Sequence, residues 1–253
     1  MKEILSVKNQ WIKELKKYQK RKYRQLDQKY LLEGFHLIEE AVKGQAPVEA
    51  ILVTQRGMSE WGSWLAEFPE EKLYFVSDEV MKQLSELPTP QGILAVVAMT
   101  NQAEITFAGK WLLLDNVQDP GNVGTMIRTA DIFGFTGVVL GEGTADIYNP
   151  KVLRSMQGSQ FHLPIIQKDL QTAIKELKAF GSLVYGTELN EEAVALNAIN
   201  KTTNLALIMG NEGQGVQKEL LTLTDKNIYI PIKGQAESLN VAIAAGILMY
   251  ELA

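Results

Sequence analysis

Three glycine-rich turns, each directly after a strongly apolar stretch, constrain the fold of this 253-residue chain more than any other feature. They cover residues 115–124, 210–215 and 233–240. Apolar runs that alternate with turns and amphipathic segments predict a parallel α/β sheet. In such a sheet, the turns that leave the carboxyl ends of the strands line one crevice. We therefore expect the three turns to converge on one ligand.

The hydrophobic pattern predicts two α/β regions joined by a linker. Residues 1–100 are expected to form a small domain, residues 101–110 the linker and residues 111–253 a larger domain, since single domains usually hold roughly 100 to 200 residues. Strands are predicted at residues 30–33, 50–53, 72–76, 93–99, 111–114, 138–140, 163–166, 183–186, 205–209 and 228–232. Helices are predicted at residues 35–43, 58–67, 78–87, 125–133, 170–180 and 240–252.

The first 30 residues carry most of the charge that could meet a nucleic acid. They hold ten basic and three acidic residues, a net charge of +7, whereas the whole chain carries −5 and the remainder therefore −12. Basic residues interleaved with Trp11, Tyr18, Tyr23 and Tyr30 suit phosphate contacts with occasional base stacking. A solvated basic helix explains the same pattern equally well. The candidate RNA contacts here are Lys16, Lys17, Lys20, Arg21, Lys22 and Arg24.

Composition argues against several classes of function. The chain contains no cysteine and two histidines, which excludes disulfides and thiolate ligands and leaves little for a zinc site, so we expect no metal. The amino-terminal residues lack the apolar run of a signal peptide, which favours a cytoplasmic protein. The longest apolar run, residues 241–250, is far shorter than the roughly 20 residues that span a bilayer, so no membrane partner is expected.

Each turn carries polar side chains that could bind a ligand or merely cap a helix. The guanidinium of Arg128 suits a phosphate, although an arginine on a helix is more often a surface residue. Glu212 lies between glycines, and Ser238 and Asn240 precede an apolar helix; each of them could serve as a helix cap. Capping does not explain why all three turns share one arrangement. Neither a dinucleotide-binding glycine motif after the opening strand nor a P-loop is present.

Residues 114–130, 209–215 and 230–242 resemble the three motifs of the SpoU (TrmH) family of RNA 2′-O-ribose methyltransferases, in the SPOUT superfamily. The resemblance covers about residues 111–253, and residues 30–41 are similar to the amino-terminal substrate-binding domain of many members. It implies an α/β fold with a mostly parallel sheet and a deep trefoil knot. It also implies a homodimer that binds S-adenosylmethionine in the knotted region.

The resemblance further implies the residues of the site. Arg128 matches the proposed catalytic arginine, and the catalytic residues expected around it are Asn116, Glu212, Ser238 and Asn240. The expected cofactor-binding residues are Gly210, Asn211, Ile230, Ser238 and Leu239. Arg154 matches an arginine that is common among relatives, although the other residues of its segment, 149–159, differ from their common pattern. Arg154 is expected to contact RNA.

Methyl transfer from a sulfonium to a ribose 2′-hydroxyl requires a site that stabilises the developing alkoxide and holds it in line with the methyl group. Because a guanidinium stays protonated at neutral pH, we favour Arg128 as a cation that binds the phosphate or alkoxide, over Arg128 as a base. Structured RNA is the expected substrate, with large-subunit ribosomal RNA favoured over transfer RNA. The alternative is a non-catalytic RNA-binding or ribosome assembly factor of the same fold.

Overall fold

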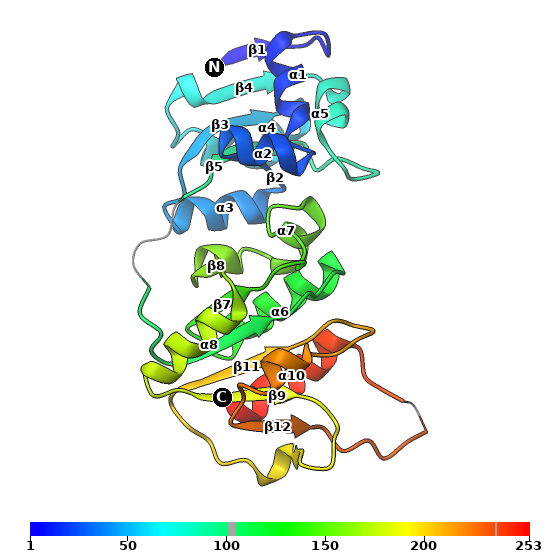
Figure 1. Ribbon diagram of the computed structural model, residues 1–253. Helices are drawn as coiled ribbons and strands as arrows, with labels where there is room; N and C mark the ends of the chain where they lie inside the picture. Colours follow the sequence, from blue (N-terminus) through cyan, green and yellow to red (C-terminus); the bar gives the residue numbers. More distant parts are fainter. Residues whose placement is uncertain (101–104, 236) are drawn as a thin grey trace. The chain divides into compact units, whose positions relative to one another are not determined.

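The computed structural model describes residues 1–100, 105–235 and 237–253, which form two compact units (Figure 1). Unit 1 contains Met1–Asn101 and Tyr148–Phe161, and unit 2 contains Gln102–Ile147 and His162–Ala253. The expected linker, residues 101–110, falls partly on residues 101–104, which lie outside the described residues. The expected domain of residues 111–253 includes a segment, Tyr148–Phe161, whose contacts are with unit 1.

Unit 1 is built on a five-stranded sheet of order β1-β4-β3-β5-β2. The pairs β1/β4 and β4/β3 are parallel, whereas β3/β5 and β5/β2 are antiparallel. The bounds are Lys2–Ile4 for β1, Lys29–Glu33 for β2, Val48–Val53 for β3, Leu73–Val76 for β4 and Ile93–Ala98 for β5. The strand predictions for this region are confirmed to within two residues at each end, while β1 was not predicted.

Six α-helices accompany this sheet within the described residues. Their bounds are Gln10–Lys17 for α1, Arg21–Asp27 for α2, Phe35–Lys43 for α3, Gln55–Leu65 for α4, Asp78–Leu84 for α5 and Pro150–Met156 for α7. A short 3-10 helix spans Glu70–Lys72. The basic segment therefore forms a strand and two short helices, not one helix. Ile12 and Leu15 of α1 are buried against Val80 and Leu84 of α5, which anchors the basic segment to the unit.

Unit 2 is built on a seven-stranded sheet of order β10-β12-β9-β11-β6-β7-β8, and every pair of neighbouring strands within the described residues is parallel. The bounds are Lys110–Leu114 for β6, Gly137–Leu140 for β7, Ile165–Gln167 for β8, Leu183–Thr187 for β9, Val194–Ala195 for β10, Leu205–Met209 for β11 and Lys226–Tyr229 for β12. The expected α/β fold with a mostly parallel sheet is confirmed.

Helices cover the two faces of this sheet. Their bounds are Pro120–Ile132 for α6, Leu170–Ala179 for α8, Lys218–Leu221 for α9 and Val241–Leu252 for α10, with 3-10 helices at Ser159–Phe161 in unit 1 and Leu196–Ala198 in unit 2. One face packs on α8, where Leu113 and Ile208 share a buried cluster with Ile174 and Leu177. Alternate strand residues, such as Leu112, are buried on the other face of the sheet. On that face α6 contacts β7, and α10 packs on α6.

Helix α6 begins five residues before the predicted position. The carboxylate of Asp119 caps it by accepting the N–H of Asn122 at 2.9 Å, and Pro120 occupies the first turn, where its missing N–H costs nothing. The second half of the first glycine-rich turn, residues 120–124, is therefore the start of a helix. Within the part of the chain that the structure describes, no helix is long and apolar enough to cross a membrane.

Candidate active site

The three glycine-rich turns lie beyond the carboxyl ends of β6, β11 and β12 of unit 2; β6 and β11 are neighbours, and β9 lies between β11 and β12. The first follows β6, the second follows β11, and β6 and β11 pair in register from Lys110↔Leu205 to Leu114↔Met209. The third precedes α10, at the end of the segment that leaves β12. The parallel sheet therefore brings the turns together, as the sequence predicted. Ala236 of the third turn lies outside the described residues.

The carboxylate of Glu212 joins the second turn to the first. Its Oε1 accepts the N–H of Asp119 at 3.1 Å and the amide Nδ2 of Asn122 at 3.1 Å, and its Oε2 accepts the N–H of Gln118 at 3.3 Å. Burial works to raise the pKa of Glu212, but these hydrogen bonds favour the charged form and together hold the pKa below its ordinary value. Glu212 is thus an ionised clamp on the start of α6.

Asn122 connects all three turns, and the sequence reasoning did not single it out. It donates through Nδ2 to Glu212, and its Oδ1 accepts Nδ2 of Asn240 at 3.1 Å. Asn240 in turn caps α10, because its Oδ1 accepts the N–H groups of Ala242 at 2.9 Å and Ile243 at 3.3 Å. The sequence signal that could have identified Asn122 is the Asp119-Pro120 pair, which marks the start of a helix and places Asn122 in its first turn.

Asn116 braces the turns in a different way from the expected catalytic role. It has a left-handed backbone with φ of 53°, and its carbonyl oxygen accepts Nδ2 of Asn211 at 2.9 Å. The Oδ1 of Asn211 accepts the N–H groups of Gly213 and Gln214, which shapes the second turn. The Oδ1 of Asn116 accepts Nε2 of Gln118 at 3.2 Å. Asn116 therefore makes no direct hydrogen bond to Glu212 within the described residues.

A cavity of about 610 Å³ opens beside these turns. This volume lies in the range of sites for small molecules and cofactors. The backbone of Gly210 is closely approached there, because a Cβ on it would lie 2.2 Å from the backbone of Gly215 and Val216. All five expected cofactor residues line this one cavity, namely Gly210, Asn211, Ile230, Ser238 and Leu239.

Arg128 is not gathered with the other expected catalytic residues in this chain. It is exposed on α6, it does not line the cavity, and its side chain makes no hydrogen bond or ion pair with any described residue. Ser238 and Glu212 do line the cavity.

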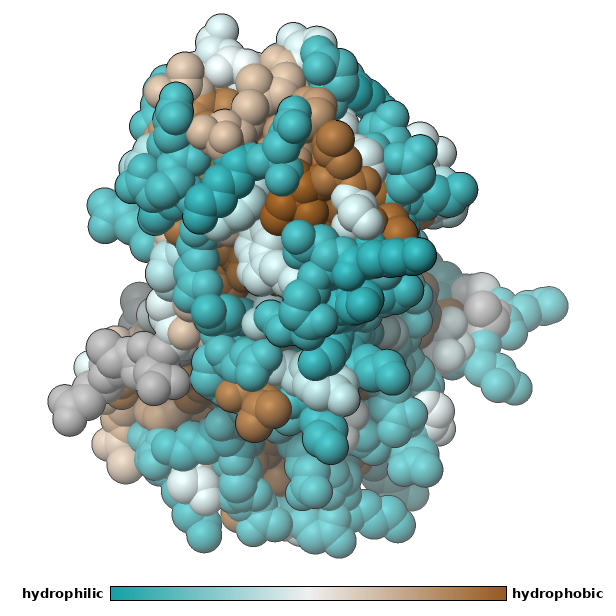
Figure 2. Space-filling view, turned by 90° about the horizontal axis from the view of Figure 1, so that it is seen from above, coloured by the Kyte–Doolittle hydropathy of each residue, from teal (hydrophilic) through white to brown (hydrophobic). Residues whose placement is uncertain are grey.

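The basic segment of unit 1 keeps most of its expected cations at the surface. Lys16 and Lys17 end α1, and Lys20, Arg21 and Lys22 begin α2; all five are exposed. Figure 2 shows a face on which hydrophilic side chains cover most of the surface, with small apolar patches between them.

Three residues that were expected to contact RNA are buried, namely Arg24, Tyr18 and Tyr30. Arg24 is only 3% exposed, and its guanidinium donates to the carbonyl oxygen of Tyr18 at 2.7 Å, just after α1. The short turn between the helices points this side chain inwards, which corrects the prediction that it contacts RNA. Tyr18 and Tyr30 are buried as well, so the prediction that they stack on bases is also wrong, whereas Tyr23 is partly exposed under the ammonium of Lys17.

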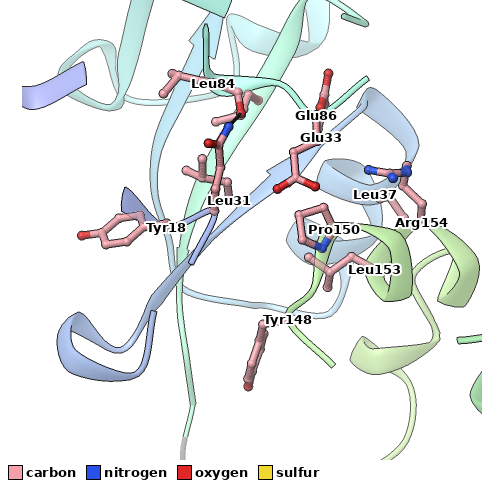
Figure 3. Close-up of a pocket in the computed structure, with 12 residues that line it drawn as sticks. Tyr18, Leu31, Glu33, Leu37, Leu84, Glu86, Tyr148, Pro150, Leu153 and Arg154 are labelled. Carbon is pink, nitrogen blue, oxygen red and sulfur yellow. Dashed lines mark hydrogen bonds between the residues drawn. The ribbon is translucent and has the colours of Figure 1, made fainter. Parts of the chain in front are cut away.

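Arg154 lies at a small cavity of unit 1, between α7 and the sheet (Figure 3). The cavity measures about 20 Å³, which is room for roughly one water molecule. Glu33 lies in it, where burial raises the pKa of its carboxyl group, while a hydrogen bond from Ser85 and the charge of Arg154 oppose that rise. We regard this cavity as a structural feature and not as a ligand site.

The described residues contain one cluster that could hold a metal ion, on α3. The possible ligand atoms of His36, Glu39 and Glu40 lie within 4.8 Å of one another. The ammonium of Lys43 lies 3.0 Å from both carboxylates and offsets one of their two negative charges. His162, the other histidine, pairs with Asp131 at 2.7 Å.

Comparisons with known proteins agree with this geometry. The model of the "SpoU rRNA Methylase family" matches residues 110–250, and that of the "MRM3-like substrate binding domain" matches residues 9–95. The chain is 46% identical, over 100% of its length and 99% of the relative, to the "23S rRNA (guanosine(2553)-2′-O)-methyltransferase RlmP" of Bacillus subtilis.

Solved structures of similar proteins cover nearly the whole chain. The AdoMet-bound rRNA methyltransferase of Sinorhizobium meliloti is 28% identical with a TM-score of 0.90, over 99% of this chain and 97% of that one. The SpoU methyltransferase AviRb of Streptomyces viridochromogenes, in complex with AdoMet, is 28% identical with a TM-score of 0.84, over 97% of each chain. The similarity therefore extends across both units.

Proposed function

The chain belongs to the SpoU rRNA methylase family, and from this premise we propose that it transfers a methyl group from S-adenosylmethionine to the 2′-hydroxyl of a guanosine in 23S ribosomal RNA. One observation carries the proposal: the clamp of Glu212 and Asn122 ties the three motif turns around a single cavity of about 610 Å³. The relative that is named for a guanosine of 23S rRNA matches this chain from end to end. This match favours ribosomal RNA over transfer RNA as the substrate.

The cavity residues fit the proposed methyl donor. The backbones of Gly210, Ile230 and Leu239 border the cavity, together with the side chains of Asn211 and Ser238. A side chain at position 210 would collide with the backbone of Gly215, so the tight hairpin keeps backbone groups available to a ligand. When bound, S-adenosylmethionine supplies the methyl group as a sulfonium, and these residues hold and orient it.

The residues around the cavity divide the remaining work. Glu212 is a poor general base because its oxygens already accept hydrogen bonds and its pKa is lowered, so it acts by fixing the start of α6. Arg128 supplies the positive charge that stabilises a phosphate or the developing alkoxide of the ribose. Ser238 has a hydroxyl at the cavity wall that can hydrogen-bond the substrate. Asn116 and Asn240 hold the first turn and α10 in position.

A homodimer completes the proposed enzyme. Helix α10 is apolar nearly all round, and it leaves Ile243 56%, Ile247 37% and Tyr250 64% exposed; Ile132 at the end of α6 is 64% exposed. A second copy packed on these residues would cover an apolar surface that water otherwise meets. It would also allow Arg128 of one chain to serve the cavity of the other. The trefoil knot and a cytoplasmic location are parts of the same proposal.

The exposed cations of unit 1 are proposed to hold the RNA. Lys16, Lys17, Lys20, Arg21 and Lys22 gather where α1 ends and α2 begins, so one stretch of phosphate backbone can meet them together. Arg154 is proposed as a further contact because its side chain is only partly buried. Phosphate contacts of this kind position an RNA without reading its sequence.

A transfer assay with purified components tests the proposal. Labelled S-adenosylmethionine is incubated with the protein and with ribosomal RNA from cells that lack it, and the RNA is digested to nucleosides. We expect label in 2′-O-methylguanosine from 23S RNA, and none with Arg128→Ala. Tight binding of S-adenosylmethionine without any transfer would instead support the non-catalytic RNA-binding alternative. Transfer by Arg128→Ala at a near-normal rate would contradict the role given to Arg128.

A further inference from the structure

A second cavity lies in unit 2, and we propose that it receives the base of the nucleotide whose ribose is methylated. This inference rests on the proposed function. The cavity measures about 280 Å³ and is bounded by Asp115, Asn116 and residues of the segment 211–219. Asn211 and Gly215, which pair across the second turn, line both this cavity and the larger one. A nucleotide lying over this shared wall would have its ribose beside the methyl donor and its base in the second cavity.

The back of the second cavity is a rigid polar wall. Asp115 is 2% exposed, and its two oxygens accept the backbone N–H and the side-chain Nε2 of Gln217, both at 2.7 Å. A carboxylate can only accept hydrogen bonds, so the Gln217 amide must turn its nitrogen to Asp115 and keep its Oε1 as an acceptor. Gln118 likewise donates to Oδ1 of Asn116, which leaves Nδ2 of Asn116 as a donor. The wall therefore offers one oriented acceptor and one oriented donor.

Two charged residues, Lys218 and Glu219, also line the second cavity. Both are exposed at the start of α9. Neither side chain makes a hydrogen bond or ion pair with another described residue. Both groups are thus available to a ligand at the opening of the cavity. Ordering these two side chains costs conformational entropy, which contacts with a bound ligand can offset.

Guanine is the base that matches this set of groups. Its Watson–Crick edge presents two adjacent N–H donors, at N1 and N2, beside the acceptor O6, whereas adenine, cytosine and uracil lack two adjacent donor positions. The carboxylate of Glu219 and Oε1 of Gln217 can take the two donors, and the ammonium of Lys218 can donate to O6. Enzymes that act on a nucleotide commonly read an extruded base through this edge.

Size and charge favour a base over other ligands. The cavity volume corresponds to roughly nine water molecules, which a flat base can displace. A phosphate would meet the carboxylates of Asp115 and Glu219 at close range, and this like charge disfavours it. Sequence recognition of RNA generally relies on unstacked bases, which fits a pocket set apart from the exposed cations that hold the backbone.

Synthetic RNAs that differ in one base test the inference. A short RNA carrying the target site is made with guanosine, inosine or 2-aminopurine riboside at the target; inosine lacks the N2 amino group, and 2-aminopurine lacks both O6 and the N1–H. With the wild-type protein we expect kcat/KM to fall about 10- to 100-fold for inosine. Glu219→Ala should abolish most of this discrimination, and Lys218→Ala should reduce the discrimination against 2-aminopurine to the part that the missing N1–H causes. Affinity for S-adenosylmethionine, measured by calorimetry, should not change.

Glu67→Ala is the matched control, because Glu67 is an exposed glutamate of unit 1 that does not line this cavity. It should keep the wild-type ratio between guanosine and inosine. The inference is overturned if the wild-type protein methylates all three RNAs equally, or if Glu219→Ala and Lys218→Ala keep the wild-type ratios. Absence of transfer to any of the RNAs would instead overturn the proposed function, and the base site with it.

Discussion

At the scale of single residues, the account depends on Asn122 and Glu212. The sequence singled out Glu212 through its place between glycines, and the family resemblance pointed to Asn116, whereas Asn122 was not singled out. Both asparagines lie in the same turn, and spacing cannot tell which amide faces the neighbouring turns. The answer depends on where α6 starts, since a helix that begins at Pro120 turns Asn122 towards Glu212 and Asn240.

We predict that Asn122→Ala lowers the rate of methyl transfer about 100-fold, because it removes the one side chain that bonds to both Glu212 and Asn240. Stability should fall by about 1 kcal/mol for the lost hydrogen bonds. Single-turnover assays and thermal unfolding measure the two effects. Gln10→Ala is the control, because Gln10 is also an exposed amide that donates to a glutamate, Glu14 at 3.0 Å. Equal rates for the two variants would contradict the central place of Asn122.

The lowered pKa of Glu212 predicts a pH dependence with a definite sign. Its ordinary pKa is 4.5 and its folded value lies below that, so its stabilising effect is complete above pH 4.5 and disappears as the pH falls through the folded value. The Tm difference between the wild-type protein and Glu212→Gln should therefore be constant from neutral pH down to 4.5 and shrink in stronger acid. A difference that grows on acidification would contradict the clamp. Glu67→Gln controls for the loss of an exposed charge.

At the scale of elements, most strands and the longer helices were predictable because their apolar residues follow a clear period. The elements missed were short or polar, among them β1 with three residues, β10 with two, α9 with four, and α7, which begins at an Asn-Pro pair in a stretch with little periodicity. Tertiary packing stabilises such elements, and a pattern within one segment cannot reveal it. Segment 148–161 packs on β2 of unit 1, a contact between residues far apart in sequence.

The hairpin after β11 gives a prediction at this scale. A Cβ at position 210 would lie 2.2 Å from backbone atoms of Gly215 and Val216, so Gly210→Ala must open the hairpin and should cost about 1–3 kcal/mol of stability. Binding of S-adenosylmethionine should be lost with it. Gly213→Ala is the control in the same turn, because its nearest atom, Oδ1 of Asn211, is 3.7 Å away. Calorimetric titration of both variants would contradict the account if they bound the cofactor equally well.

At the scale of the whole molecule, the family motifs made the activity and the methyl donor predictable, and the homodimer that the resemblance implies stays a prediction. An apolar helix is compatible with burial in its own chain or against another one. The exposed residues of α10 and the position of Arg128 outside the cavity together favour a second chain.

The proposed dimer is tested by a charge on its apolar face. Ile243→Glu would bury a carboxylate between the two chains, so it should convert a dimer of 28.2 kDa chains into monomers and abolish methyl transfer. Phe180→Glu, at another exposed apolar position that follows α8, should leave both unchanged. Sedimentation equilibrium measures the mass. A wild-type protein that sediments as an active monomer would contradict this part of the account.

The most direct test of the central claim is a map of ribose methylation in ribosomal RNA from cells with and without this protein. The account predicts that one guanosine of 23S RNA loses its 2′-O-methyl group when the protein is absent, and that the wild-type chain restores it while Arg128→Ala does not. An identical map in both cell lines, or a lost methyl group that is restored equally by Arg128→Ala, would contradict it.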